Sequence, residues 1–198
     1  MEDPCERVSI RPNPRDKEPV AIPTVQEMQT ILRTADRLAN SKNSEVASAW
    51  ERYRPMIYLA ADSGMRPQEY LVLPCASVLD NGIKIVQALD RSNRIGPPKT
   101  KAGRRYIPVG SQSLDLVRRY MAKHGDENFV FPTRRDGGCQ RYNVFVRRGF
   151  HILMEQAGLV TETEVKGRRV LLKHYTPYSL RHFFASMLIE QNKSLKYI

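Results

Sequence analysis

Two arginines lie where a guanidinium group could be held in a fixed position. Arg66 stands in a Gly-Met-Arg-Pro corner between two expected helices, and the residue before a proline is kept out of the helical region. Arg181 follows Pro177 near the start of an expected helix over 177–191, and we place it in the first turn, where backbone N–H groups favour an anion. A fixed guanidinium can hold phosphate oxygens with its planar fork. The alternative for Arg181 is a solvated charge on an amphipathic helix, whereas the tight corner at Arg66 is a poor place for a solvated charge.

Other polar residues accompany these arginines. Glu69 comes three residues after Arg66 and is well placed to orient it. Lys99 and Lys101 stand in a stretch rich in glycine, proline and charge, where a lysine could contact a phosphate from a flexible loop. His182 directly follows Arg181, and His174 lies a few residues before it. Arginine, lysine and histidine side chains that lie far apart in sequence would form an anion site if the fold brought them together.

Composition points to the kind of anion. The chain has 198 residues, with 32 Lys and Arg against 21 Asp and Glu, a formal net charge of +11 and a pI of about 9.8. A chain this basic favours nucleic acid as a partner, with an acidic membrane surface as the second choice. No apolar run approaches the roughly 20 residues of a membrane span, and the first residues lack a signal sequence. Three widely spaced cysteines predict a reducing compartment, with neither a disulfide framework nor a metal site.

The first half of the chain predicts helices that meet near Arg66. Residues 1–23 are rich in proline and charge and predict an extended linker. Thr24 and Glu27 form a capping box that opens a helix to about residue 38. A second helix is expected from about 45 to Gly64, a natural C-cap. Pro67 then restarts a helix at its first position.

The middle of the chain predicts a small sheet. Asn81-Gly82 is a hairpin-turn signal between apolar runs. A second hairpin is expected with its turn over 96–105 and a return strand over 106–109. The simplest assembly is an antiparallel sheet of about three strands.

The rest of the chain is predicted to be mostly helical. We expect helices over 113–123, 141–157 and 177–191, and an extended segment over 129–131. Residues 161–173 are charged and predict a loop or a small hairpin, and another helix is expected to begin around residue 194. Four apolar residues of the helix over 177–191 recur at helical spacing and predict an apolar stripe: Leu180, Phe184, Met187 and Leu188. Apolar surface near Leu188 is expected to be exposed. The predicted fold class is therefore α+β, mostly helical.

These motifs, in this order on a basic chain, resemble the catalytic domain of the tyrosine recombinases, or phage-type integrases. The resemblance spans roughly residues 20–198. Residues 63–69 (SGMRPQE) resemble the family's first catalytic arginine with its acidic support, and residues 98–108 (PKTKAGRRYIP) resemble its lysine hairpin. Residues 176–182 (TPYSLRH) resemble its His-x-x-Arg-His box, and residues 20–31 its linker and first helix. The resemblance implies one catalytic domain over residues 24–198.

The resemblance also implies a reaction. The family breaks and rejoins DNA without a metal or other cofactor, by attack of a tyrosine that gives a 3′-phosphotyrosine intermediate. Arg66 and Arg181 would clamp the charge of the transition state, and Lys99, with Lys101 as the alternative, would give a proton to the leaving 5′-oxygen. The remaining assignments are Glu69 as support for Arg66, His182 as a structural or supporting group, and Tyr178 as a phosphate ligand.

Two departures from the family pattern stand out. Tyr178 occupies a position where the family usually has histidine, and a tyrosine with a reference pKa of about 10 is a poor base near neutrality. His174 is the possible substitute. The family's later His or Trp and its nucleophilic tyrosine have no counterpart, because Tyr197 comes too soon after Arg181. We therefore expect a domain that is incomplete at its C-terminus and inactive alone, either a separated domain, a proteolytic product or a broken gene.

Three functions remain open at this stage. The first is the catalytic core of a site-specific DNA recombinase, acting on double-stranded DNA with other recombinase protomers in the bacterial cytoplasm, at the nucleoid. The second is a basic domain that binds DNA without chemistry, such as a degenerate recombinase. The third is a type IB topoisomerase, which shares the chemistry; the Ser-Leu-Arg-His and Pro-Lys-Thr sequences resemble integrases more closely. The spacing of Arg66, Lys99 and Arg181 favours the first, since non-specific binding needs no such set.

Overall fold

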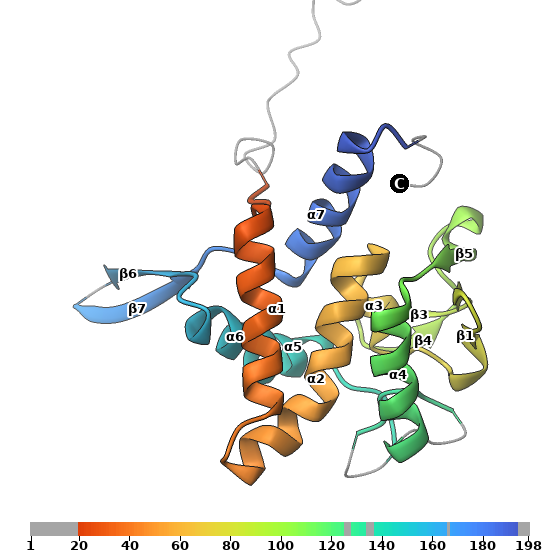
Figure 1. The fold of residues 1–198 in the computed structure, drawn as a ribbon, viewed down its shortest axis with the longest axis horizontal. Helices are drawn as coiled ribbons and strands as arrows, with labels where there is room; N and C mark the ends of the chain where they lie inside the picture. The colour runs from red at the N-terminus through yellow and green to blue at the C-terminus, as the bar shows by residue number, and fades with distance from the viewer. Residues whose placement is uncertain (1–19, 125–127, 134–136, 166, 194–198) are drawn as a thin grey trace, which may run out of the picture.

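The computed structural model describes residues 20–124, 128–133, 137–165 and 167–193. Residues 1–19, which make up most of the expected linker, lie outside it, so the linker stays a prediction. A helical body is flanked by three small antiparallel β-structures (Figure 1). The predicted α+β class with mostly helical content is confirmed.

Two long helices form the front of the body. α1 (Val25–Ala39) begins with the predicted capping box between Thr24 and Glu27, and α2 (Ser44–Ser63) is capped by the Asn43 side chain. α1 packs along α2 (Figure 1). Asp36 of α1 accepts hydrogen bonds from Arg54 Nε at 2.6 Å and from the Tyr58 hydroxyl at 2.7 Å, so a polar link supplements the apolar contact.

The end of α2 is a sharp corner. Gly64 caps the helix in the left-handed conformation, with φ of +59°, which glycine adopts without strain. A Cβ at this position would lie 2.4 Å from Cδ1 of Phe184, so only glycine lets the helix that carries Phe184 come this close. The four-residue helix α3 (Pro67–Tyr70) starts immediately after the corner.

The three-stranded sheet is confirmed, with one shift of register. β1 (Val78–Leu79), β2 (Gly82–Ile85) and β5 (Arg105–Pro108) pair antiparallel in the order β1-β2-β5. Because Leu79 pairs with Gly82, the turn residues are Asp80 and Asn81, one position before the predicted Asn81-Gly82. Gly82 instead allows β5 to lie close to β2, because a Cβ there would be 2.2 Å from the carbonyl oxygen of Ile107.

The return strand predicted over 106–109 is confirmed as β5, but the turn of the second hairpin was predicted in the wrong place. β3 (Ala88–Leu89) pairs with β4 (Ile95–Gly96), so the turn covers 90–94 and not 96–105. The Asp90 carboxylate determines this turn by accepting from the backbone N–H of Ser92 at 2.7 Å, and from the backbone N–H and Nε of Arg94 at 2.9 Å each. The following stretch, including the short helix η3 (Lys101–Gly103), leads into β5.

The expected helix over 141–157 contains a π-helical turn. It consists of α5 (Tyr142–Phe145), the π-helical η4 (Val146–Phe150) and α6 (His151–Gln156). Within the π-helical turn, Gly149 lies against the ring of Tyr53, and a Cβ there would be 3.1 Å from Cδ1 of that ring. The sequence contained no signal that predicted this widening of the helix.

Two further helices and a hairpin complete the chain. α4 (Ser111–His124) covers the predicted 113–123. In place of the extended segment expected over 129–131, only Phe129 forms an isolated antiparallel bridge, with Pro74, and Val130 N–H is bonded to Leu73 O at 2.9 Å. Residues 161–173 form a hairpin of β6 (Val160–Val165) and β7 (Arg168–Lys173), which projects from the body (Figure 1).

α7 (Pro177–Glu190) is the predicted helix, and most of its apolar stripe is only half-buried. Leu180 is buried, whereas Phe184, Met187 and Leu188 are partly exposed. The helix expected around residue 194 lies outside the described residues.

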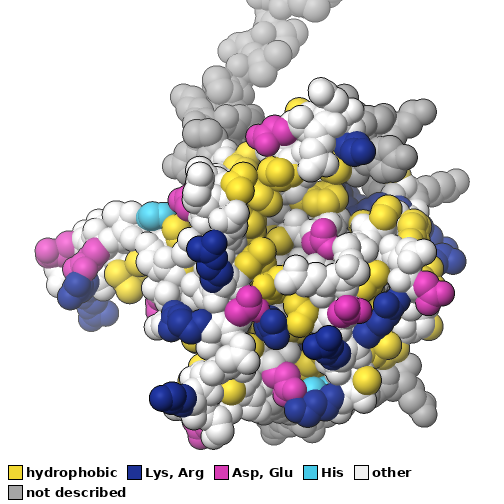
Figure 2. Space-filling model, in the orientation of Figure 1, with side chains coloured by type: hydrophobic (Ala, Val, Ile, Leu, Met, Phe, Trp, Pro, Cys, Tyr) yellow, Lys and Arg dark blue, Asp and Glu magenta, His cyan; other side chains and the backbone are white. Residues whose placement is uncertain are grey.

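The core lies between the helices and the three-stranded sheet. Its largest fully buried side chains include Ile31, Met56, Ile57, Leu59, Tyr70, Ile83, Phe131, Phe145 and Phe150. On the face formed by α1, α2 and α4, basic side chains are interspersed with acidic and apolar ones (Figure 2). Within the described residues, no helix combines the length and the apolar character needed to cross a membrane.

Candidate active site

Arg66 stands at the N-cap of α3, between the corner at Gly64 and Pro67. Its φ of −71° and ψ of 146° are extended, as expected for a residue before proline. Its backbone N–H donates to Glu69 Oε2 at 2.8 Å and its Nη1 donates to Glu69 Oε1 at 3.1 Å. The structure thus places Glu69 where the sequence predicted it, against Arg66.

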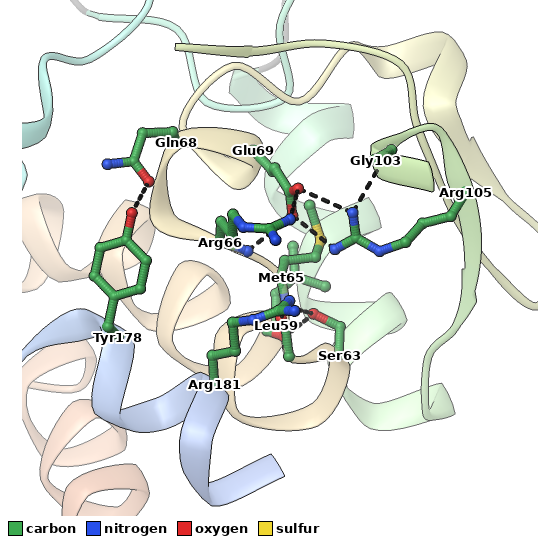
Figure 3. Close-up of polar contacts among 11 residues, drawn as sticks. Leu59, Ser63, Met65, Arg66, Gln68, Glu69, Gly103, Arg105, Tyr178 and Arg181 are labelled. Carbon is green, nitrogen blue, oxygen red and sulfur yellow. Dashed lines mark hydrogen bonds and ion pairs between the residues drawn. The ribbon is translucent and has the colours of Figure 1, made fainter. Parts of the chain in front are cut away.

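Arg105 also binds Glu69, and the sequence analysis missed it. Its Nη1 donates to Oε1 and its Nη2 to Oε2, both at 2.9 Å, and Nη1 also donates to the carbonyl oxygen of Gly103 at 3.1 Å (Figure 3). A usable signal was present: side chains alternate along a strand, so Arg105 shares a face with the buried Ile107. An arginine on that face needs an acidic partner.

Glu69 is the buried centre of the cluster. Its side chain is 1% exposed, against 25% for Arg105 and 48% for Arg66. Burial by itself raises the pKa of a carboxyl group, but the hydrogen bonds from Arg105, from the Arg66 backbone and from the Arg66 side chain outweigh it and hold the pKa of Glu69 below its usual value. Glu69 is therefore an anion that fixes two guanidinium groups.

Arg181 approaches the cluster from α7. It is the fifth residue of this helix, so it stands at the start of the second turn and not, as predicted, in the first turn. Its Nη1 donates instead to the carbonyl oxygen of Gly64. The pKa of Arg181 is lowered by burial first, and then by the positive charges of Arg66 and Arg105. The three guanidinium groups therefore lie close enough to repel one another.

A groove of about 950 Å³ borders the cluster on one side. Arg66, Lys99 and Tyr178 line it, together with the β3–β4 hairpin. Lys99 is exposed in this groove, whereas Lys101 begins η3 and its side chain lies outside the described residues. The structure thus brings the predicted Lys99 and Tyr178 to Arg66.

Tyr178 is held in the groove by a residue that the sequence analysis did not single out. Its hydroxyl donates to Oε1 of Gln68 at 2.6 Å (Figure 3). Gln68 follows Arg66 by two residues and lines the same groove.

A second hollow of about 610 Å³ lies between α7 and β5. Arg105 and Arg181 line it at the cluster, and Tyr106, Phe184 and Leu188 line it farther out. The two hollows thus expose the arginine cluster from two directions.

The histidines are placed less centrally. His182 follows Arg181 on α7 and is partly buried. His174 bonds the Thr161 hydroxyl at 2.9 Å, at the base of the β6–β7 hairpin, and is not among the residues that line either hollow. The structure therefore gives His174 no place as a substitute for the family's histidine.

The chemistry available in this cluster is that of holding an anion. Among the described residues, no group of three or more His, Cys, Asp or Glu side chains could hold a metal ion. Arginine groups fixed by packing and by a buried carboxylate are preorganised donors for phosphate oxygens.

A family comparison agrees with this geometry. The family described as "Phage integrase family" matches residues 24–198. The chain belongs to this phage integrase family. The family assignment predicted from the arginine, lysine and Ser-Leu-Arg-His motifs is thereby confirmed.

Relatives within the integrase family include tyrosine recombinases. The chain is 31% identical over 148 residues to the tyrosine recombinase XerC of Xylella fastidiosa (strain 9a5c), which covers 73% of this chain and 42% of the relative. It is 24% identical over 167 residues to the tyrosine recombinase XerD of Rickettsia bellii, which covers 79% of this chain and 49% of the relative. The chain thus spans less than half the length of these relatives.

Solved structures show the same fold. The integrase of transposon Tn1549, in complex with a circular intermediate DNA, matches 90% of this chain and 56% of its own with a TM-score of 0.65 and 18% identity. A lambda integrase tetramer bound to a Holliday junction matches 91% of this chain and 46% of its own, with a TM-score of 0.59 and 16% identity. The integrase fold predicted from the sequence is confirmed.

Proposed function

We propose that this integrase-family chain is the phosphate-holding core of a site-specific DNA recombinase. Its substrate would be a phosphodiester of double-stranded DNA, and the reaction would join the 3′-phosphate to a tyrosine. The proposal is supported most by one observation: Arg66 and Arg181, 115 residues apart in sequence, come together beside the buried Glu69, with Arg66 lining the groove and Arg181 lining the second hollow.

The arginines would act on the charge of the transition state. A phosphodiester carries one negative charge, and attack by a tyrosine oxygen adds a second before the 5′-oxygen leaves. Guanidinium groups that are already positioned stabilise this developing charge without reorganisation. Arg66 uses only Nη1 on Glu69, so the rest of its fork can serve a phosphate.

Lys99 would supply the proton that the leaving 5′-oxygen needs. It is exposed in the groove that Arg66 lines, and a positioned acid contributes to a step in which an alkoxide would otherwise leave. The attacking hydroxyl loses one proton and the leaving oxygen gains one, so the proton count balances. Lys101 stays the alternative.

Tyr178 would contribute to the wall of the groove and not to proton transfer. Its hydroxyl proton is directed at Gln68, and tyrosine is a weak base near neutrality, with a reference pKa of about 10. We therefore propose that the pair takes the place of the family's histidine as a pair of neutral hydrogen-bonding groups.

A basic domain that binds DNA without chemistry is the alternative. Counterion release alone would give such binding, and it needs only a positive surface. A buried carboxylate that organises guanidinium groups is more than this function requires. The cluster therefore favours the recombinase core. We place its action on DNA in the bacterial cytoplasm, at the nucleoid, together with other recombinase protomers.

The test is duplex binding by the 198-residue chain at several salt concentrations. We expect affinity to fall steeply with salt, and Arg66→Met and Arg181→Met each to lower it and to reduce the salt slope by about 1. Lys42→Met is the matched control, because Lys42 is exposed just before the start of α2 while the cluster lies at its other end. A 20-residue helix spans about 30 Å.

The proposal fails in either of two cases. One is that the wild-type chain does not bind duplex DNA even at low salt. The other is that Lys42→Met weakens binding as much as the two cluster variants do, which would mean that charge alone, and not the cluster, holds the DNA.

A further inference from the structure

Glu69 is held by two arginines that approach it from different elements. Arg105 reaches it from β5 with both terminal nitrogens, and Arg66 reaches it from α3 with Nη1 and the backbone N–H. Each carboxylate oxygen thus accepts two hydrogen bonds, one from each arginine (Figure 3). A carboxylate offers about four acceptor positions, so the position of Glu69 depends on Arg105 as much as on Arg66.

The two arginines differ in what else they can do. Arg105 commits both terminal nitrogens to Glu69 and is the more buried of the two, whereas Arg66 commits one and has a half-exposed side chain in the groove. A two-pronged arginine pair is the more rigid arrangement. Arg105 is therefore the anchor of Glu69, and Arg66 is the group that Glu69 presents to the groove.

The charge balance assigns a second effect to Arg105. The guanidinium groups of Arg66, Arg105 and Arg181 and the carboxylate of Glu69 leave two net positive charges beside the groove and the second hollow. Without Arg105, the buried Glu69 would be balanced by Arg66 alone, and the cluster would keep one net positive charge. A phosphodiester has one negative charge and gains a second on attack, so the difference affects the transition state most.

We propose that Arg105 is a positioning residue: it anchors Glu69, which orients Arg66, and it balances the carboxylate so that Arg66 and Arg181 keep their charge for the phosphate. The first part concerns the fold alone. The second part rests on the proposed function, since it assumes a phosphate in the groove.

The first experiment tests the anchor without DNA. The backbone N–H of Arg66 donates to Glu69, so its amide signal in ¹H–¹⁵N spectra reports the ionisation of that carboxyl group. We expect the acid titration of this signal to move to higher pH in Arg105→Met, because a buried carboxylate that loses its two-pronged partner is harder to ionise. Arg104→Met, at the exposed neighbouring position, should leave the titration where it is in the wild type.

The second experiment tests the charge balance by duplex binding. We expect Arg104→Met to weaken binding about threefold, as for the loss of one exposed positive charge. Arg105→Met should weaken it about tenfold, because the carboxylate of Glu69 would then be balanced by Arg66 alone. Adding Glu69→Gln to Arg105→Met restores two net positive charges, and glutamine still offers an oxygen to Arg66. The double variant should therefore bind within about threefold of the wild type.

Arg105→Lys is the control for misfolding, because it keeps the positive charge and loses only the planar fork. Its amide spectrum should stay native, and its DNA affinity should stay within about threefold of the wild type. An unmoved titration in Arg105→Met would overturn the anchor. Equal binding by Arg105→Met and Arg104→Met, or no recovery in the double variant, would overturn the charge balance. If the wild type does not bind DNA, the proposed function fails while the titration still decides the anchor.

Discussion

The Tyr178 hydroxyl donates to Gln68 Oε1 at 2.6 Å, and each residue directly follows a proline that opens a helix. Pro67 begins α3 and Pro177 begins α7. A proline at the first helical position fixes the backbone there, so the two side chains are aimed from two fixed helix starts. This contact joins the segments that carry Arg66 and Arg181.

The first prediction concerns this contact. Gln68→Leu and Tyr178→Phe should each lower the free energy of unfolding by about 1 kcal/mol, and the double variant should lose little more than either single variant, because all three lack the same hydrogen bond. Urea unfolding of the four proteins gives the coupling energy. Additive losses would show that the two side chains act independently and that the hydrogen bond contributes nothing.

The sequence predicted the helices and the site better than it predicted the turns. The capping box of α1, the cap at Gly64 and the extended backbone before Pro67 depend on neighbouring residues, and all three were correct. The turns at 80–81 and 90–94 were predicted at the wrong positions, the first because a distant contact decides it and the second although its closing contacts are local. Gly82 lies where β5 approaches too closely for a side chain. The Asp90 carboxylate closes the turn over 90–94 by accepting from the backbone N–H groups of Ser92 and Arg94.

The parts of the site that were missed depend on pairs far apart in sequence. Arg105 is hydrogen-bonded to Glu69, 36 residues away in sequence, and Tyr178 is hydrogen-bonded to Gln68, 110 residues away. A family motif draws attention to Arg66 and Arg181, but it does not say which residues hold them. Strand alternation could have indicated Arg105, whereas nothing in the sequence indicated Gln68 or the π-helical turn at Val146–Phe150.

The second prediction compares two glycines with positive φ. Gly64→Ala should cost about 2–4 kcal/mol of unfolding free energy, from left-handed strain and from a clash with Phe184. Gly158→Ala is the control, because φ is +71° there and no atom lies within 4 Å of the added Cβ; strain alone should cost about 1–2 kcal/mol. Thermal or urea unfolding measures both.

The duplex affinity of the same two variants tests the site. Arg181 donates to the carbonyl oxygen of Gly64, so moving this corner should weaken DNA binding in Gly64→Ala and leave it unchanged in Gly158→Ala. Equal affinities in the two folded variants would mean that the corner does not position Arg181.

The third prediction is a pH dependence of stability. The pKa of Glu69 is lower in the folded chain than its ordinary value of 4.5, so its contribution is complete above the unfolded pKa and is lost as the pH falls through the folded pKa. The stability difference between wild type and Glu69→Gln should therefore be about 2 kcal/mol and constant from pH 7 to about 5.5, and should shrink below about pH 4.5.

Urea unfolding at several pH values measures this difference, in which the titrations of the other carboxyl groups cancel. A difference that grows as the pH falls would contradict the prediction. It would mean that Glu69 is protonated more easily in the folded chain than in the unfolded one.

The last prediction is that the 198-residue chain alone forms no covalent adduct with DNA. A nucleophile must reach the phosphorus in line with the leaving oxygen, and most described tyrosines are held elsewhere. Tyr53, Tyr58, Tyr70, Tyr120 and Tyr175 are buried. Burial and the Asp36 carboxylate also raise the pKa of the Tyr58 hydroxyl to about 12. Tyr142 is half-buried, Tyr178 is bonded to Gln68, and Tyr197 lies outside the described residues.

Tyr106 is the exception that the experiment must address, because it is exposed and lines the same hollow as Arg181. Its hydroxyl lies over Gly82, where it would be 2.7 Å from an added Cβ, so we expect it to pack on the sheet and not to attack DNA. The chain is incubated with a nicked duplex that traps cleaved products, and a denaturing gel is run. Tyr106→Phe and Tyr197→Phe are the matched variants, and none of the three proteins should give a slow-migrating covalent band. A band in the wild type that disappears in one variant would identify that tyrosine as a nucleophile and overturn the prediction.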